Sequence, residues 1–154
     1  MSLIYADDLA PDAALKCLLE DSSTYLIDVR TKAETIFVGV PQLSNLENGV
    51  DLSEKYCLIE WQLFPSMQTN DSFIDELSAR LDKWRSHDGV EAADRVLLFL
   101  CRSGVRSAYA ADVATKMGCN KSYNISGGFE GDVNDGGHRS HLSGWKFTGL
   151  PWSQ

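Results

Sequence analysis

A cysteine that follows an apolar run is the side chain of this sequence best placed to do chemistry. Residues 96–100 are continuously apolar, as in a strand covered on both faces, and Cys101 comes directly after them. A short basic loop with Gly104 at its centre follows, and apolar residues at helical spacing begin after it. Cys101 is therefore expected at a junction between a strand and a helix.

The junction predicts an environment that favours the thiolate form of this cysteine. The first N–H groups of a helix have no partner within the helix, and they carry the positive end of its dipole. Arg102 and Arg106 add formal charge, and Gly104 lets the backbone turn without a Cβ in the way. The same donors suit an oxyanion. An inert buried cysteine is the simpler alternative, but it explains neither the arginines nor the glycine.

Composition and charge indicate a small globular enzyme. We expect a single domain over residues 1–154, a length sufficient for one core. The net charge of -8 argues against nucleic acid or an anionic membrane surface as a partner. No apolar stretch approaches about 18 residues, and residues 1–8 lack the pattern of a signal peptide. A cytoplasmic location is therefore predicted.

The four cysteines stand in unrelated contexts, without a CxxC pair, so reduced thiols are expected rather than disulfides or a zinc site. They are Cys17, Cys57, Cys101 and Cys119. His138 and His141 have acidic neighbours, but two spaced histidines without a third fixed ligand indicate a solvated loop more than a metal site. Neither a metal nor a cofactor is expected.

Apolar runs alternate with helical periods along the chain, which predicts an α/β fold with a mostly parallel sheet. Strands are expected at residues 3–5, 25–29, 55–61, 96–100 and 121–125. Helices are expected from Pro11, from Asn70 or Asp71, and after the cysteine loop with a stop at Gly118. Residues 36–51 and the glycine-rich tail from Gly127 follow neither period.

Four motifs, in order along most of the chain, resemble those of the rhodanese-like sulfurtransferases. The loop CRSGVRS at residues 101–107 is similar to the family's CxxGxR pattern, and residues 26–34 resemble its LIDVRxxxE signature. Residues 123–129 look like its V-x-x-L-x-G-G segment, and residues 145–151 resemble its closing tryptophan and GLP. The resemblance implies a single rhodanese-like domain with a central parallel five-stranded sheet flanked by helices on both faces.

The resemblance implies sulfur transfer through a persulfide on Cys101. The sulfur would come from a small anionic donor such as thiosulfate, and it would pass to a small thiol, a protein thiol or cyanide. Asp28 and Arg30 are expected to support the site, with Asp28 accepting loop N–H or hydroxyl hydrogen bonds and Arg30 pairing with Glu34. Donor binding is expected from the loop residues Arg102, Ser103, Gly104, Val105, Arg106 and Ser107.

One segment departs from the family pattern. Most members have a GHIPGA-type turn after the first signature, where this chain has FVGVPQ at residues 37–42 and then a longer stretch. That turn usually helps to shape the approach to the catalytic loop. Trp61, Phe64 and Met67 lie in or beside a loop, and we expect them to pack beneath it rather than to form an apolar rim for an acceptor protein or a wall of the donor pocket.

Two other functions use a similar framework. Cysteine phosphatases also place a cysteine in an anion loop between a strand and a helix, but they need five residues between cysteine and arginine. Here four residues separate Cys101 from Arg106, and no aspartate carries a phosphatase-like acid-loop motif. Rhodanese-like binding modules form the other alternative, and they usually have the cysteine replaced.

Overall fold

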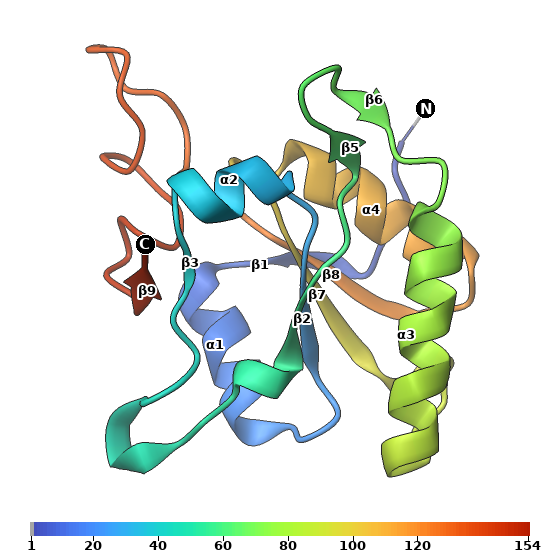
Figure 1. Ribbon diagram of the computed structural model, residues 1–154. Coiled ribbons are helices and arrows are strands. Elements are labelled where there is room, and N and C mark those ends of the chain that lie inside the picture. The colour runs from blue at the N-terminus through green and yellow to red at the C-terminus, as the bar shows by residue number, and fades with distance from the viewer. Residues whose placement is uncertain (1) are drawn as a thin grey trace.

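A five-stranded parallel sheet forms the centre of the molecule (Figure 1). The computed structural model describes residues 2–154. The strands lie in the order β1, β8, β7, β2 and β4, and every neighbouring pair is parallel. Their bounds are β1 Asp7–Leu9, β2 Tyr25–Asp28, β4 Tyr56–Leu58, β7 Val96–Leu100 and β8 Lys121–Ile125. The predicted parallel five-stranded sheet is confirmed.

Different helices cover the two faces of the sheet, as Figure 1 shows. Ile27 and Phe99 belong to the apolar cluster beneath two helices, α3 (Phe73–Asp88) and α4 (Val105–Lys116). Leu26 and Leu98 belong to the opposite cluster, beneath α1 (Pro11–Glu20). Successive residues of a strand point to opposite faces, so the central strands are buried on both sides and form unbroken apolar runs.

The two segments without a clear period pair with distant parts of the chain. Within residues 36–51, a short strand β3 (Val40–Pro41) pairs antiparallel with β9 (Trp152–Ser153) near the C-terminus. Because each partner is far away in sequence, neither segment shows a local pattern. The remaining elements are α2 (Lys32–Phe37), the hairpin strands β5 (Gln62–Leu63) and β6 (Gln68–Thr69), and single 3-10 turns at Glu47–Gly49, Ser53–Lys55 and Ala92–Asp94.

The first strand lies later than the apolar pattern predicted. A strand was expected at residues 3–5, but β1 is formed by the polar stretch Asp7–Leu9. Edge strands are selected by backbone pairing, here with β8, rather than by burial. Ile4 stays exposed and its N–H donates to the Asp112 carboxylate. No helix within residues 2–154 has both the length and the apolar character needed to cross a membrane.

The tail after β8 docks its backbone directly against the cysteine loop. The N–H of Phe129 donates to the carbonyl of Cys101 at 2.8 Å, and the N–H of Glu130 donates to that of Arg102 at 2.9 Å. Gly128 precedes them with φ +62°, and a Cβ there would lie 2.5 Å from the Cys101 carbonyl oxygen. Glycine is therefore required at this position both by conformation and by space.

This contact predicts a large effect of Gly128→Ala. Gly137 also has a positive φ, at +80°, but a Cβ there would meet nothing within 4 Å. We expect Gly137→Ala to lower the free energy of unfolding by about 1 kcal/mol, the conformational cost alone. Gly128→Ala should cost about 3 kcal/mol or more, because the loop backbone must also move. Urea unfolding of both variants measures the difference, and equal losses would contradict the proposed close contact.

Candidate active site

Cys101 lies at the floor of a pocket beside the carboxyl end of β7. Its side chain is only 1% exposed, and the pocket above it has a volume of about 360 Å³. The carboxyl ends of β2 and β8 reach the same edge of the sheet, because the strands are parallel. The lining residues are Glu34, Gln62, Met67, Cys101, Arg102, Ser103, Val105 and Arg106. Four of the expected loop residues, Arg102, Ser103, Val105 and Arg106, therefore border the cysteine's pocket.

The two remaining loop residues contact the sulfur itself. Gly104 caps the start of α4 with φ +104°, a conformation that L side chains rarely adopt, and its N–H lies 3.1 Å from Cys101 Sγ. Ser107, in the first turn of α4, places its Oγ 3.1 Å from the same atom. The sulfur therefore lies against the positive end of a helix, as the loop pattern indicated.

A buried amide behind Ser107 was missed by sequence reasoning. Asn124, in β8, places its Oδ1 2.5 Å from Ser107 Oγ. Its Nδ2 donates to Asp8 Oδ1 at 3.0 Å and to the carbonyl of Gly104 at 3.1 Å. A polar side chain inside an otherwise apolar strand was the available signal, because buried polar groups need partners.

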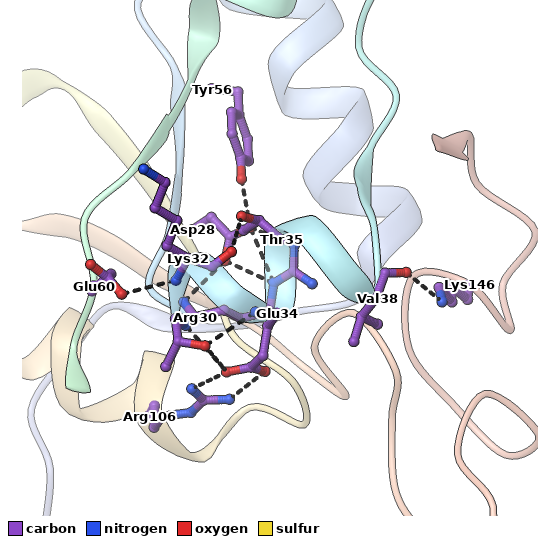
Figure 2. Close-up of polar contacts among 11 residues, drawn as sticks. Asp28, Arg30, Lys32, Glu34, Thr35, Val38, Tyr56, Glu60, Arg106 and Lys146 are labelled. Carbon is purple, nitrogen blue, oxygen red and sulfur yellow. Dashed lines mark hydrogen bonds and ion pairs between the residues drawn. The ribbon is translucent and has the colours of Figure 1, made fainter. Parts of the chain in front are cut away.

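Glu34 pairs with Arg106 and not with Arg30, which corrects the sequence prediction. Two nearly parallel hydrogen bonds join the groups, Nη1 to Oε1 at 2.7 Å and Nη2 to Oε2 at 3.0 Å (Figure 2). Burial by itself would raise the pKa of Glu34, but the hydrogen bonds and charge of Arg106 outweigh it and hold the pKa below its ordinary value. The pair ties α2 to the first turn of α4 beside the cysteine.

Arg30 instead forms a buried ion pair with Asp28. Its Nη2 lies 2.7 Å from Asp28 Oδ2, and both side chains are fully buried (Figure 2). The hydroxyl of Tyr56 donates to the same oxygen at 2.7 Å, and the Arg30 guanidinium lies 4.3 Å above the Phe129 ring. Asp28 therefore accepts a hydrogen bond from the hydroxyl of Tyr56 in β4 and none from the cysteine loop, where its partners were expected. The sequence separation of Arg30 and Glu34 suggested a pair, whereas the end of β2 turns Arg30 inward.

Arg102 is the cation of the pocket that has no acidic partner. Its side chain is exposed, and the ion pairs found among residues 2–154 do not include it. Arg106 is already neutralised by Glu34. The sequence prediction of two available positive charges is therefore reduced to one. An anion entering the pocket meets Arg102 as its main formal charge.

The hairpin of β5 and β6 leaves the apolar side chains of Phe64 and Met67 exposed, contrary to the expected packing beneath a loop. Phe64, in the turn, is 64% exposed, and Met67 borders the pocket while remaining 39% exposed. Only Trp61 packs inward, with its ring edge-on to Phe73 at 5.0 Å. The hairpin and α2 lie at the same end of the sheet (Figure 1). The entrance to the pocket is therefore partly apolar.

The other three cysteines are held as thiols by burial. Burial raises the pKa of Cys57 to about 12, and it also raises the pKa of Cys17 and of Cys119. Cys119 follows the C-terminus of α4, whereas Cys101 precedes its N-terminus, and a helix of 12 residues separates them by about 18 Å. Cys119 is therefore too far from Cys101 for the two sulfur atoms to react with each other.

The Glu34–Arg106 pair predicts a pH-dependent contribution to stability. Because the pKa of Glu34 is lower in the folded state, the pair stabilises that state at pH values above the ordinary 4.5. This stability disappears as the pH falls through the lowered value. We expect Glu34→Gln to reduce the free energy of unfolding by about 1–3 kcal/mol at pH 7. The difference from wild type should shrink toward pH 3.

Urea unfolding at a series of pH values measures this difference. Glu91→Gln removes an exposed carboxylate after α3 and controls for the change in net charge. A Glu34→Gln difference that stays constant between pH 7 and pH 3 would contradict the ion-pair explanation.

Comparisons with known proteins agree with this geometry. A model of the rhodanese-like domain matches residues 12–135. The uncharacterized protein RP600 homolog of Rickettsia rickettsii is 35% identical over 139 residues, which cover 90% of each chain. The crystal structure of Rv0390 from M. tuberculosis is 39% identical, with a TM-score of 0.81, and the match covers 98% of this chain and 99% of that one.

A more distant structure shares the fold. The polysulfide-sulfur transferase homodimer of Wolinella succinogenes is 22% identical, with a TM-score of 0.58, and the match covers 95% of this chain and 77% of that one. The family model spans the first signature, the cysteine loop and the glycine turn that docks on it. The chain therefore belongs to the rhodanese-like family.

Proposed function

We propose that the protein is a sulfurtransferase that carries sulfane sulfur as a persulfide on Cys101. The observation that carries the proposal is the environment of Sγ, which lies at the floor of a pocket with Gly104 N–H and Ser107 Oγ each 3.1 Å away. A thiolate in this position is stabilised by the Gly104 N–H and by the positive end of α4, and it faces an opening through which a donor can enter.

The first half-reaction loads the sulfur. The Cys101 thiolate attacks the outer sulfur of thiosulfate, a new S–S bond forms to Sγ, and the S–S bond of thiosulfate breaks. The bonding electron pair leaves with sulfite, and the outer sulfur keeps in the persulfide the negative charge that it carried in thiosulfate. The N–H groups at the start of α4 can stabilise this charge, because they point toward the loop.

The second half-reaction unloads it. An acceptor thiolate or cyanide attacks the outer sulfur, the bond to Sγ breaks, and its electron pair restores the Cys101 thiolate. Met67 gives the pocket an apolar side chain at its border, which is compatible with a small thiol or a protein thiol as the acceptor. The Wolinella relative is described as a polysulfide-sulfur transferase, which supports sulfur transfer on this fold.

The length of the loop favours sulfur over phosphate. Four residues separate Cys101 from Arg106, one fewer than a phosphatase loop needs, so the loop is too short to surround a phosphoryl group. In addition, the Arg106 guanidinium is bound at both ends to Glu34, so it is not available to clamp phosphate oxygens. Both observations favour a reaction in which the loop holds one sulfur atom.

A persulfide assay tests the proposal directly. Incubation with thiosulfate should add one sulfur atom to the protein, seen by intact mass spectrometry, and addition of cyanide should remove it and release thiocyanate. Cys101→Ser should show neither effect. Cys57→Ser is the matched control, because Cys57 is a buried thiol outside the pocket, and it should load like wild type.

Alkylation of the thiols with iodoacetamide makes it possible to interpret a persulfide assay in which no sulfur is added. Limited iodoacetamide should label Cys101 before Cys17, Cys57 and Cys119, because desolvation raises the pKa of each of those three thiols. If Cys101 is labelled but neither the sulfur adduct nor thiocyanate forms, the protein is not a thiosulfate sulfurtransferase. Vanadate-sensitive turnover of an aryl phosphate would instead favour a phosphatase.

Arg102 is expected to capture the anionic donor. Arg102→Gln removes the pocket's one cation without an acidic partner, so the kcat/KM for thiosulfate should fall about five- to thirtyfold, mostly through KM. Added salt should weaken wild type more than the variant. Arg80→Gln, an exposed substitution on α3 that does not border the pocket, should leave the rate unchanged. Equal losses in the two variants would exclude this role.

A further inference from the structure

The amide of Asn124 has one possible orientation. Its Nδ2 contacts Asp8 Oδ1 and the backbone carbonyl of Gly104, at 3.0 and 3.1 Å, and both of these oxygens are acceptors. The two hydrogens of the amide nitrogen are therefore both used. The side-chain oxygen must then be the atom that faces Ser107, at 2.5 Å from its Oγ.

This orientation determines what Ser107 can offer to the cysteine. An amide oxygen only accepts, so the hydroxyl of Ser107 donates its single hydrogen to Asn124. The lone pairs of Ser107 Oγ then face Cys101 Sγ at 3.1 Å. In this arrangement the cysteine is the donor, through its S–H, and the serine is the acceptor.

We propose that Asn124 is a positioning residue that holds the hydroxyl hydrogen of Ser107 away from Cys101 and thereby favours the thiol over the thiolate. When the thiolate forms, Ser107 can rotate its hydrogen to the sulfur only by leaving the Asn124 oxygen without a donor. The inference rests on the proposed function in taking Cys101 as the reacting nucleophile.

In the persulfide, the competition between Asn124 and Sγ for the hydroxyl hydrogen of Ser107 is weaker. In the persulfide the negative charge lies on the outer sulfur, and Sγ becomes a weak acceptor. The hydroxyl of Ser107 then donates its hydrogen to Asn124 again, and backbone N–H groups stabilise the charge on the outer sulfur. Asn124 therefore disfavours the free thiolate relative to both the thiol and the persulfide, which moderates the reactivity of the empty site.

The first two substitutions of the test, Asn124→Leu and Ser107→Ala, leave the charged groups around the cysteine unchanged. Arg102 and Arg106 face the pocket from the loop and α4, Glu34 faces it from α2, and Asp8 lies behind Asn124 on β1. Asn124→Leu is close to isosteric and neutral, and it removes the acceptor while leaving these charges in place. Ser107→Ala removes the hydroxyl for which Asn124 and the sulfur compete.

A double-mutant cycle, read by the pH profile of Cys101 alkylation with iodoacetamide, separates positioning from general support. With Ser107 present, Asn124→Leu should move the midpoint about one pH unit lower, raising the rate about tenfold at pH values below the midpoint. In the Ser107→Ala background, the same substitution should have little effect on the profile. Ser122→Ala, which removes another buried hydroxyl near β8, is the matched control.

The double-mutant cycle removes from the comparison any shift of the pH profile that comes from a displaced loop. Loss of the Asn124 bond to the Gly104 carbonyl would shift the profile by the same amount with or without Ser107. An equal shift in both backgrounds, or none with Ser107 present, would overturn the proposal. Alkylation needs no sulfur donor, so this result is independent of whether the protein transfers sulfur.

A second variant covers the case in which Asn124→Leu does not fold, as judged by circular dichroism. Asn124→Asp keeps an oxygen toward Ser107 and strengthens it as an acceptor, so the midpoint should rise. Part of that rise comes from the added charge alone and remains in the Ser107→Ala background. The proposal requires a larger rise with Ser107 present, and an equal rise in both backgrounds would contradict it.

Discussion

The cysteine loop must turn its N–H groups toward one sulfur atom, so its carbonyl groups need donors from outside the loop. The carbonyls of Cys101 and Arg102 accept from the tail segment 129–131, and that of Gly104 accepts from Asn124. A buried carbonyl without a partner is costly, and so the loop keeps its shape only while β8 and the tail are docked. This constraint explains why residues far apart in sequence act together at one site, and why glycine at position 128 is as tightly constrained as the loop itself.

The close packing of α2 against α4 also determines which arginine at the pocket carries an unpaired charge. An arginine in the first turn of α4, close to the cysteine, would be a strong cation, but Glu34 binds both ends of the Arg106 guanidinium. That pair positions α2 against α4 and leaves the helix dipole, backbone N–H groups and Ser107 as the near neighbours of the sulfur. Arg102, at the exposed side of the pocket, is then free to meet an incoming anion. One arginine of the site is thus held in an ion pair, and the other is exposed at the pocket without an acidic partner among residues 2–154.

The sequence predicted the central features because they depend on local patterns. An unbroken apolar run identifies a strand buried on both faces, and the residues after it identify the loop at Cys101. The contacts that it missed depend on three-dimensional neighbours. Arg30 and Glu34 are four residues apart, yet the turn after β2 sends Arg30 into the core and Glu34 toward α4. Phe64 has an apolar side chain but occupies a hairpin turn with no layer above it.

The contacts of the sulfur indicate how its reactivity is limited as well as raised. Formal charges near the surface are screened by salt and solvent, whereas hydrogen bonds at 3.1 Å act at short range regardless of ionic strength. Among residues 2–154 the N–H of Gly104 forms its hydrogen bond with Cys101 Sγ and with no competing acceptor, so it is a fixed donor to the sulfur. The hydroxyl of Ser107 can donate its hydrogen to Asn124 Oδ1 instead of to the sulfur, so these two hydrogen bonds compete. The sulfur therefore has one fixed donor, the Gly104 N–H, and one contested donor, the Ser107 hydroxyl. This balance depends on neutral groups, and it therefore persists when the charge of the pocket is changed.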